Sequence, residues 1–355
     1  MKICILSIVN IKHMSAASLY LDYFRDRGIK FDIIYIDKYL KPERIDAENI
    51  YRYELKIERN WNKLKKVSRY YTFRKYAKKI LDENKYDLVI TWGTETAFLF
   101  FDYLIFRLKN KYIINIRDYA NLNNKIKYKT LDMLIANSAF TTISSKGFKS
   151  FLPNREYINI HSINKGILNK VNKRQDLRKE GQPIRICFLG YVRFYDNDKK
   201  LIDALGNDNR FILQYFGVGS DVLEDYAKGK GINNIEFMSS FDVEETSQLL
   251  EQADIINNLY GYNNIALDTA VSIKYYYTVS LKIPILVYEN TYMEKVSENI
   301  GFVFDDNYID LGDRIYQWYS NLDTEDFKMC CDKKLQQIEN ENRVFFNKLK
   351  DVFGE

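Results

Sequence analysis

Cations and a glycine cluster in the second half of the chain in an arrangement that suits a diphosphate. Arg193 follows Gly190 by three residues, and Lys199 and Lys200 stand at the start of a segment, 199–205, with helical apolar spacing. A fixed guanidinium, an ammonium group and a helix N-terminus are groups that bind phosphate in proteins. This stretch therefore predicts a phosphate site, with Arg193 and either Lys199 or Lys200 as its cations.

Buried strands ending in glycine turns are expected to position these residues. The apolar run over 184–189 predicts a strand that Gly190 ends, and a second run over 211–216 ends at Gly217 and Gly219. Parallel strands bring their carboxyl ends to one edge of a sheet, which is where open α/β sheets bind ligands. We therefore expect both turns to line one site.

A second set of polar residues follows expected strands in the first half of the chain. In chain order they are His13, Trp92, Thr94, Glu95, Arg117 and Asp118. Asp118 is the first candidate for a general base, followed by Glu95 and His13. An ion pair with Arg117 or a turn cap is an equally open role for Asp118. Trp92, Thr94 and Arg117 are expected to line a cleft.

The length and a repeated opening predict two domains. The chain has 355 residues, of which 46% are hydrophobic and 28% charged, and residues 2–9 repeat the pattern base, Ile, Cys, apolar, Leu found at 185–192. A working site is expected in a cleft between the two domains. The predicted parts are an α/β domain at 1–165, an α/β domain at 166–325 and a helix at 326–355 that braces both.

Apolar periodicity predicts the remaining elements. The expected strands lie at 3–9, 31–36, 86–91, 112–116, 134–143, 157–161, 234–237, 253–260 and 282–288, and the expected helices at 60–81, at 243–252, from 272 and beyond 308.

The four cysteines do not resemble a disulfide framework or a zinc site. Cys4 and Cys187 fall inside expected strands, and Cys330 and Cys331 are adjacent. The apolar run after Lys2 is too short to span a membrane and lacks a cleavage pattern, so a cytoplasmic location is expected. No Gly-x-Gly-x-x-Gly follows the first strand, which argues against a dinucleotide cofactor.

The net charge of +5 conceals an asymmetry between the two parts of the chain. Residues 1–180 carry 36 Lys and Arg against 19 Asp and Glu, whereas the remainder carries 17 against 29. The expected helix at 60–81 contains no acid, and its cations alternate with an apolar side that includes Trp61, Leu64 and Val67. Such a helix can lie on an anionic membrane or can pack on a sheet with a solvated basic face. No nucleic-acid motif accompanies the charge, so no nucleic-acid partner is expected.

An ordered set of residues between 190 and 284 recurs in a known family. The set resembles the carboxyl half of GT-B glycosyltransferases, particularly the bacterial enzymes of capsular and exopolysaccharide synthesis, while the first half matches only in general architecture. The matching residues are Gly190, Arg193, Lys199 or Lys200, Leu201, Ile202, Ala204, Leu205, Gly217, Gly219, Asn234, Ile235, Phe237, Leu249, Leu250, Ala253, Asp254, Ile255, Lys274 and Pro284.

The resemblance implies two Rossmann-like domains facing each other across a cleft, with a nucleotide-sugar donor on the second and an acceptor on the first. Positive charge and helix ends would stabilise the departing diphosphate, so neither a metal nor another cofactor is expected. The donor-binding residues that the resemblance implies are Gly190, Arg193, Lys199, Gly217, Gly219, Tyr260, Ser272 and Lys274.

The chain departs from the family pattern at three places. Tyr277 stands seven residues before Pro284, where many retaining members have a Glu, and the nearest acid upstream is Asp268. Lys282 replaces a small residue, and the pair 117–118 replaces a His-Asp pair. These departures leave the donor-sugar contacts and the retaining or inverting outcome open.

The sequence thus predicts a glycosyltransferase that extends a lipid-linked repeat unit of a surface polysaccharide. Its acceptor would be a glycan or lipid-linked glycan, with peripheral contact to an anionic membrane through residues 60–80. A non-hydrolysing nucleotide-sugar epimerase and an inactive nucleotide-sugar-binding partner subunit are the alternatives. An epimerase would convert the donor without an acceptor, but its cleft is rich in His and acids, and this chain has two His, His13 and His161.

Overall fold

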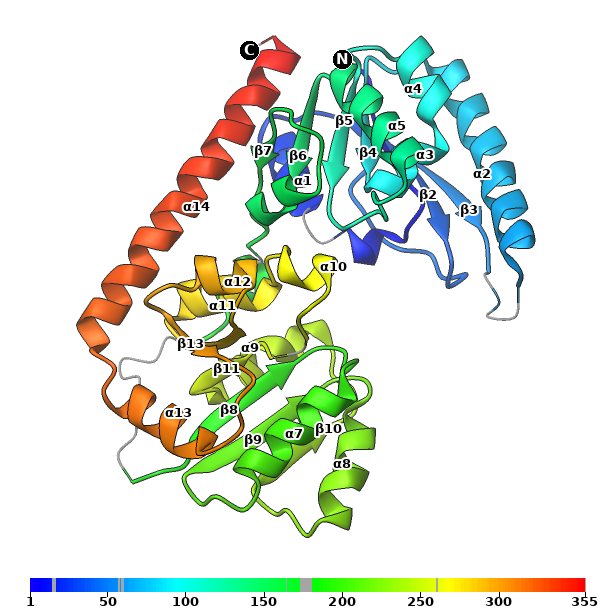
Figure 1. Ribbon diagram of the computed structural model, residues 1–355. Coiled ribbons are helices and arrows are strands. Elements are labelled where there is room, and N and C mark those ends of the chain that lie inside the picture. Colours follow the sequence, from blue (N-terminus) through cyan, green and yellow to red (C-terminus); the bar gives the residue numbers. More distant parts are fainter. Residues whose placement is uncertain are drawn as a thin grey trace. The chain divides into compact units, whose positions relative to one another are not determined.

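The computed structural model divides the chain into two compact units (Figure 1). The amino-terminal unit comprises Met1–Ser162 together with Asn340–Glu355, and the carboxyl-terminal unit comprises Ile163–Glu339. The structure describes residues 1–14, 17–56, 58, 61–163, 165–172, 181–259 and 261–354. Each unit contains one parallel sheet with helices packed on it, which confirms the prediction of two α/β domains.

The sheet of the amino-terminal unit has seven parallel strands in the order β3-β2-β1-β4-β5-β6-β7. Ile3 pairs with Phe31 on one side and with Leu88 on the other, so β1 is the strand from which the order departs in both directions. The strands are β1 (Ile3–Ser7), β2 (Phe31–Asp37), β3 (Asn49–Glu54), β4 (Leu88–Trp92), β5 (Tyr112–Ile116), β6 (Phe140–Ile143) and β7 (Ile158–Asn159).

Helices cover this sheet. On one face, Tyr20 and Phe345 pack with Ile3 and Ile5 in a buried cluster, which places α1 and the end of α14 on the same face. Elsewhere Phe73 of α2 lies edge-on to Phe100, and both are fully buried. The helices are α1 (Ala17–Asp26), α2 (Lys63–Asn84), α3 (Thr94–Leu99), α4 (Phe101–Arg107), α5 (Lys125–Ala136) and α14 (Thr324–Phe353).

Two features of the first half differ from the expectation. The strand predicted at 134–143 is wrong in its first part, because Leu134 and Ile135 share a buried helical face with Leu131 in α5, and β6 begins only at Phe140. Strand β3 was not predicted, because it is a partly exposed edge strand in which charged and apolar residues mix and no apolar run marks it.

The sheet of the carboxyl-terminal unit has six parallel strands in the order β10-β9-β8-β11-β12-β13. Alternate residues of β8 face opposite sides: Ile186 and Phe188 join one buried cluster, and Cys187 and Leu189 join the other. The strands are β8 (Ile184–Leu189), β9 (Phe211–Phe216), β10 (Ile235–Met238), β11 (Ile255–Asn257), β12 (Ile285–Tyr288) and β13 (Gly301–Phe304).

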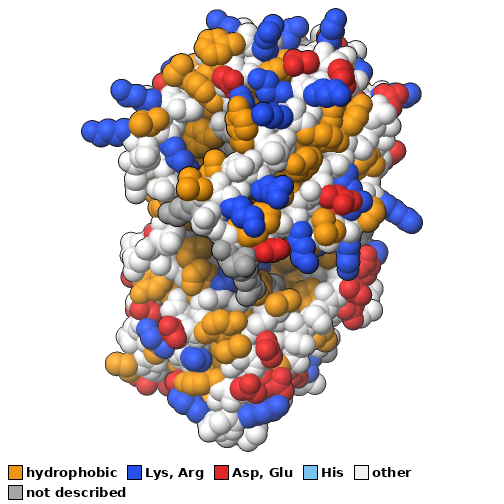
Figure 2. All heavy atoms as spheres, turned by 90° about the vertical axis from the view of Figure 1, so that its right-hand side faces the viewer, with side chains coloured by type: hydrophobic (Ala, Val, Ile, Leu, Met, Phe, Trp, Pro, Cys, Tyr) orange, Lys and Arg blue, Asp and Glu red, His pale blue; other side chains and the backbone are white. Residues whose placement is uncertain are grey.

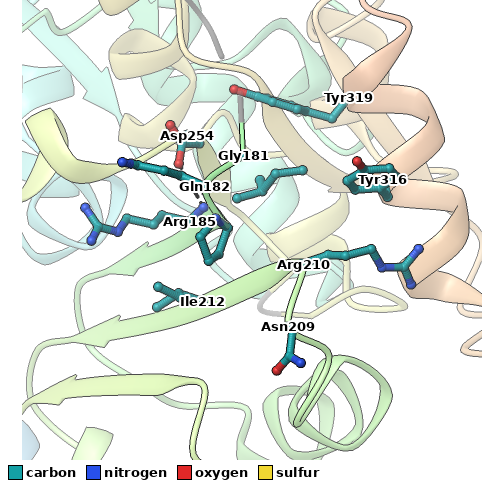
Figure 3. A pocket seen from close by; sticks show the side chains of 11 residues that line it. Gly181, Gln182, Arg185, Asn209, Arg210, Ile212, Asp254, Tyr316 and Tyr319 are labelled. Carbon is teal, nitrogen blue, oxygen red and sulfur yellow. Dashed lines mark hydrogen bonds between the residues drawn. The ribbon is translucent and has the colours of Figure 1, made fainter. Parts of the chain in front are cut away.

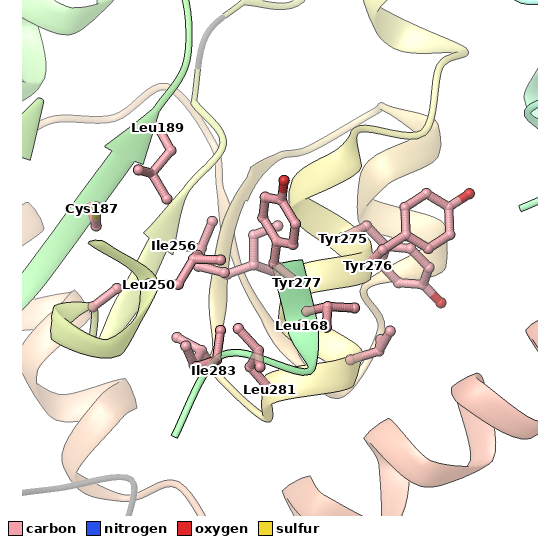
Figure 4. Close-up of a cluster of buried hydrophobic side chains, with 14 of the residues drawn as sticks. Leu168, Cys187, Leu189, Leu250, Ile256, Tyr275, Tyr276, Tyr277, Leu281 and Ile283 are labelled. Atoms are coloured by element: carbon pink, nitrogen blue, oxygen red, sulfur yellow. The ribbon is translucent and has the colours of Figure 1, made fainter. Parts of the chain in front are cut away.

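The helices of this unit divide between the two faces. Leu201 of α7 and Leu223 of α8 pack with Phe188, whereas Leu250 of α9 and Tyr277 of α11 pack with Leu189. Figure 4 shows the second cluster, with three consecutive tyrosines, 275–277, projecting from α11. The helices are α6 (Lys165–Leu168), α7 (Tyr195–Leu205), α8 (Ser220–Gly229), α9 (Thr246–Gln252), α10 (Ile265–Asp268), α11 (Ile273–Leu281), α12 (Tyr292–Val296) and α13 (Leu311–Ser320).

Candidate functional site

Two glycine turns touch each other at the carboxyl ends of β8 and β9. Gly190 and Gly217 have φ angles of +131° and +135°, and a Cβ on Gly217 would lie 1.9 Å from the Gly190 carbonyl oxygen. The pairing continues past the strands, since Gly190 donates to the Phe216 carbonyl at 2.9 Å and Val192 donates to the Val218 carbonyl at 3.0 Å. Glycine is therefore required at position 217.

Helix α8 begins directly beyond the second turn. Gly219 is its N-cap in a left-handed conformation, with φ +92°, and a Cβ there would lie 2.7 Å from the Tyr195 hydroxyl oxygen. The first N–H groups of a ten-residue helix are thus presented at the same edge as Gly190. We call residues 190–193 and 217–220 the glycine edge.

The predicted cations occupy different places around this edge. Arg193 is exposed on the turn after β8 and lies over the ring of Tyr191, 5.1 Å from the ring centroid. Because α7 starts at Tyr195 rather than at residue 199, Lys199 lies in its second turn, with Nζ 5.1 Å from the Tyr226 ring centroid of α8. Arg193 is therefore the predicted cation that belongs to the turn itself.

Lys274 lies in the first turn of α11 and is buried, with 4% of its surface exposed. The Ser272 hydroxyl caps this helix by accepting the Lys274 backbone N–H at 3.3 Å. The Lys274 Nζ lies 3.7 Å from the centroid of the Phe188 ring in β8. The resemblance implied that Lys274 stands at a helix start beside the donor; the structure places it in the first turn of α11, with its ammonium group over the ring of Phe188, two residues before Gly190.

Asp198 is a buried acid whose charge acts on this lysine, and no sequence pattern singled it out. It lies in the first turns of α7 with 1% of its surface exposed. Burial raises the pKa of Asp198 and lowers the pKa of Lys274, and the charge of each group opposes the shift of the other. The two shifts move both pKa values toward the neutral range. A sequence signal for Asp198 was absent because acids are common near helix starts.

Two further residues selected from the sequence, Tyr260 and Tyr277, are not seen at the glycine edge. Tyr260, three residues beyond β11, lies outside the described residues. Tyr277, which stands where the resembling family has a Glu, is 7% exposed and packs in the apolar cluster with Leu189 and Ile256. Tyr277 is therefore a core residue.

A polar network absent from the sequence prediction holds the loop after β1. Asn10 donates to Asp37 at 2.9 Å and to Glu43 at 2.8 Å, and Glu43 accepts the backbone N–H groups of residues 11 and 12, both at 2.9 Å. Burial acts to raise the pKa of Asp37, but hydrogen bonds from Asn10, a backbone N–H and Arg52 outweigh it and lower the pKa. The network fixes the loop that carries His13.

His13 is exposed at the end of this loop. Its Nε2 lies 3.0 Å from the Tyr39 hydroxyl, and Lys12 lies over the same tyrosine ring. Partial burial and the neighbouring Lys12 charge lower the pKa of His13, which favours the neutral imidazole near neutral pH. The ring can therefore accept or donate a proton.

The turn after β4 contains one buried and one exposed candidate. Trp92 is 3% exposed and packs against Tyr20, so it belongs to the core beneath the edge and does not form an open cleft wall. Thr94 is also buried, and its hydroxyl has no hydrogen-bond partner among the described residues. Glu95 is exposed and forms an ion pair with Lys127 at 3.2 Å.

Asp118 is exposed on the loop after β5, and Arg117 beside it is partly buried. The Arg117 carbonyl accepts the Ser144 hydroxyl at 3.4 Å. His13, Glu95 and Asp118 thus follow β1, β4 and β5, which are neighbouring parallel strands, so all three lie at the carboxyl edge of one sheet. His13 contacts Tyr39 and Glu95 pairs with Lys127, so Asp118 remains the first candidate for the general base.

A cavity of about 360 Å³ lies at the opposite edge of the carboxyl-terminal sheet. Figure 3 shows it at the amino ends of β8 and β9, with Arg185 and Arg210 pointing away from each other and Tyr316 and Tyr319 on a third side. Arg210 is engaged with Asp208 and Asp313. This cavity is separate from the glycine edge. Among the described residues, no group of three or more His, Cys, Asp or Glu side chains could hold a metal ion.

Comparison with solved structures identifies the fold. Sucrose-phosphate synthase from Thermosynechococcus elongatus superposes with a TM-score of 0.76 at 10% identity, covering 100% of this chain and 99% of that one. A glycosyltransferase from Rickettsia africae gives 0.72 at 16% identity, covering 99% of each chain. The chain has the GT-B fold.

Two other GT-B neighbours carry nucleotides. HepE from Anabaena, in complex with UDP, has a TM-score of 0.72 at 10% identity, covering 99% of this chain and 100% of that one. A UDP-GlcNAc 2-epimerase from Neisseria meningitidis, bound to UDP-GlcNAc, has a TM-score of 0.63 at 11% identity with the same coverage. No protein-family model matches the sequence, and no curated protein matches it.

Proposed function

We propose that this GT-B chain is a glycosyltransferase that moves a sugar from a nucleotide sugar to an acceptor glycan. The observation that carries the proposal is the glycine edge, where two turns are in contact, α8 begins and Arg193 stands exposed on the first turn. Backbone N–H groups and a guanidinium suit a diphosphate. HepE, which has the same fold, was solved in complex with UDP, and this supports a nucleotide as the ligand.

The chemistry follows from charge. Negative charge develops on the departing nucleoside diphosphate, and Arg193, the start of α8 and Lys274 would stabilise it without reorganisation. If the reaction inverts the anomeric centre, Asp118 is the first candidate to accept the acceptor proton, ahead of Glu95 and His13, since these two already contact Lys127 and Tyr39. A retaining reaction would need no dedicated base.

Arg193→Ala is expected to weaken UDP binding by roughly 1–3 kcal/mol, about 5- to 150-fold in Kd, because a charge-assisted contact to phosphate is lost. A thermal-shift screen of nucleoside diphosphates first identifies the preferred base. Titration calorimetry with that nucleotide, UDP if uracil is preferred, then measures the change in Kd. Arg185→Ala is the matched control, since Arg185 lies on β8, the strand before the Arg193 turn, but at its opposite end. An unchanged Kd in Arg193→Ala would remove Arg193 from the site.

The epimerase is the second candidate because a UDP-GlcNAc 2-epimerase shares the fold at a TM-score of 0.63. An epimerase converts UDP-GlcNAc without any acceptor, so proton NMR of the sugar after incubation with the chain alone separates the two activities. Conversion without acceptor would replace the transferase proposal. Nucleotide binding without turnover on any acceptor would instead favour a partner subunit that has lost catalysis.

We further propose a lipid-linked acceptor at an anionic membrane surface, which α2 would contact. Leu64, Val67 and Tyr71, spaced three and four residues apart, are 81%, 66% and 49% exposed and form one stripe. Lys65 and Arg69 lie exposed beside the stripe. Figure 2 presents the side of the molecule that carries α2, where basic and hydrophobic side chains are interspersed over the amino-terminal unit. Among the described residues, no helix is both long and apolar enough to cross a bilayer.

The double variant Leu64→Asp/Val67→Asp is expected to reduce partitioning onto phosphatidylglycerol-containing vesicles by more than about tenfold, because two apolar contacts become repulsive charges. Cosedimentation at low and high salt measures the partitioning. Met329→Asp/Val344→Asp changes two exposed apolar side chains of α14 and serves as the charge-matched control. A wild-type chain that stays in the supernatant with anionic vesicles would contradict the membrane contact.

A further inference from the structure

Asp198 and Lys274 are buried charged residues on helices that cover opposite faces of the carboxyl-terminal sheet. Leu201 places α7 in the cluster that contains Phe188, and Tyr275 places α11 in the cluster that contains Leu189. Asp198 is 1% exposed and Lys274 is 4% exposed. Both residues lie near the start of their helix, which in a parallel sheet is the carboxyl edge.

The Lys274 side chain reaches across this edge. Its helix packs on the face of Leu189, but its Nζ lies 3.7 Å above the ring of Phe188, which faces the other side. In the sheet, β8 lies between β9 and β11, and the strand order departs from β8 in both directions. Open α/β sheets bind ligands at this point. The ammonium group therefore contacts Phe188, which precedes Gly190 by two residues.

The burial of Asp198 has a cost in solvation. Neither of its carboxylate oxygens meets the full geometry of a hydrogen bond with a described residue, although the Tyr215 hydroxyl lies close enough to lower the Asp198 pKa. Isolating a carboxylate from water is unfavourable unless a cation compensates it. Lys274 and Tyr215 act on the pKa of Asp198, and Asp198 and Cys187 act on the pKa of Lys274. Lys274 is the one cation among these four groups.

We propose that Asp198 is a positioning residue for nucleotide binding: it keeps the Lys274 ammonium charged and in place at the β8–β11 edge, where the diphosphate would bind. This inference rests on the proposed function. Asp198 would act through Lys274 and would not touch the nucleotide.

The pH dependence distinguishes this role from simple packing. Burial lowers the pKa of Lys274, and the Asp198 carboxylate opposes that shift. Removing the carboxylate therefore lowers the Lys274 pKa further, so Lys274 is uncharged over a wider range at high pH. Above the pKa, each unit of decrease reduces the charged fraction about tenfold. The loss of UDP affinity should therefore be greatest at alkaline pH and should shrink as the pH falls.

The first experiment needs no nucleotide. The full chain, labelled with ¹³C at the lysine ε-carbons, is titrated by NMR, and Lys274→Arg identifies the Lys274 signal. In Asp198→Asn the midpoint of Lys274 is expected to move to lower pH than in the wild type. Asp208→Asn, which removes a carboxylate paired with Arg210 in the same unit, should leave it unchanged. An unchanged midpoint in Asp198→Asn would overturn the coupling.

The second experiment measures UDP affinity by calorimetry between pH 6 and 8.5 in a double-mutant cycle of Asp198→Asn and Lys274→Met. We expect Asp198→Asn to weaken binding about tenfold at pH 8 and less at pH 6, and to have no further effect when Lys274 is already Met. A loss that is equal at every pH, or that adds fully to Lys274→Met, would overturn the inference. Wild-type protein that binds no nucleotide would overturn the proposed function as well, whereas wild-type binding with unaffected Asp198→Asn would overturn this inference alone.

Discussion

Gly217→Ala is expected to destabilise the carboxyl-terminal unit by about 3 kcal/mol or more and to abolish measurable UDP binding. The new methyl group would lie 1.9 Å from the Gly190 carbonyl oxygen, and the φ angle of +135° is unfavourable for any side chain. The two turns must separate, and the start of α8 moves with them. Urea denaturation gives the stability, and calorimetry with UDP gives the affinity.

The same helix offers a matched control. Gly229→Ala adds a methyl group at the end of α8, where no atom lies within 4 Å and no positive φ is required. This variant should be neutral or slightly more stable, since Ala restricts the unfolded chain. Gly190→Ala should fall between the two, because its φ is +131° but its Cβ would meet nothing within 4 Å. Wild-type stability in Gly217→Ala would show that the turns are not held in contact.

Phe345→Ala is expected to lower the free energy of unfolding of the amino-terminal unit by about 3–5 kcal/mol, because a fully buried aromatic ring is replaced by a cavity. The ring contacts Tyr20 at a centroid distance of 4.8 Å and Phe140 at 6.4 Å. In a Trp318→Phe background the remaining tryptophans, Trp61 and Trp92, both belong to this unit, so fluorescence during urea denaturation reports on it.

The neighbouring Val344→Ala provides the control for this prediction. Val344 precedes Phe345 on α14 and is 58% exposed, so its truncation should change the stability by less than about 0.5 kcal/mol. If Phe345→Ala were as mild as Val344→Ala, the end of α14 would not form part of the amino-terminal core in solution.

The fold was predictable where apolar runs are fully buried. Strands β1, β4, β5, β8 and β9 are hydrophobic except for one polar or charged residue each, because helices cover both faces, and the sequence marks each of them. Prediction failed where this signal is weak or ambiguous. An edge strand, β3, mixes exposed and partly buried residues, and the apolar end of α5 resembled the start of a strand.

The candidate site was predictable for residues that the backbone itself requires. Gly190, Gly217 and Gly219 were selected as turn glycines, and all three have positive φ angles. The positions of side chains selected by residue type alone were predicted less well. Trp92 is a core residue, and Lys199 lies one turn further into α7 than expected. Asn10, Glu43 and Asp198 were missed because their roles depend on partners far away in the sequence or on burial, which spacing does not encode.

The division of the chain has a consequence for protein synthesis. The core of the amino-terminal unit includes Phe345 and Leu349, which the ribosome adds only after the whole of Ile163–Glu339. At about 5–20 residues per second this interval lasts roughly 10–35 s. During that time the nascent first unit exposes the apolar surface of α1 that the final helix will cover. The core of the part of the chain made first can therefore be completed only after the rest of the chain has been made.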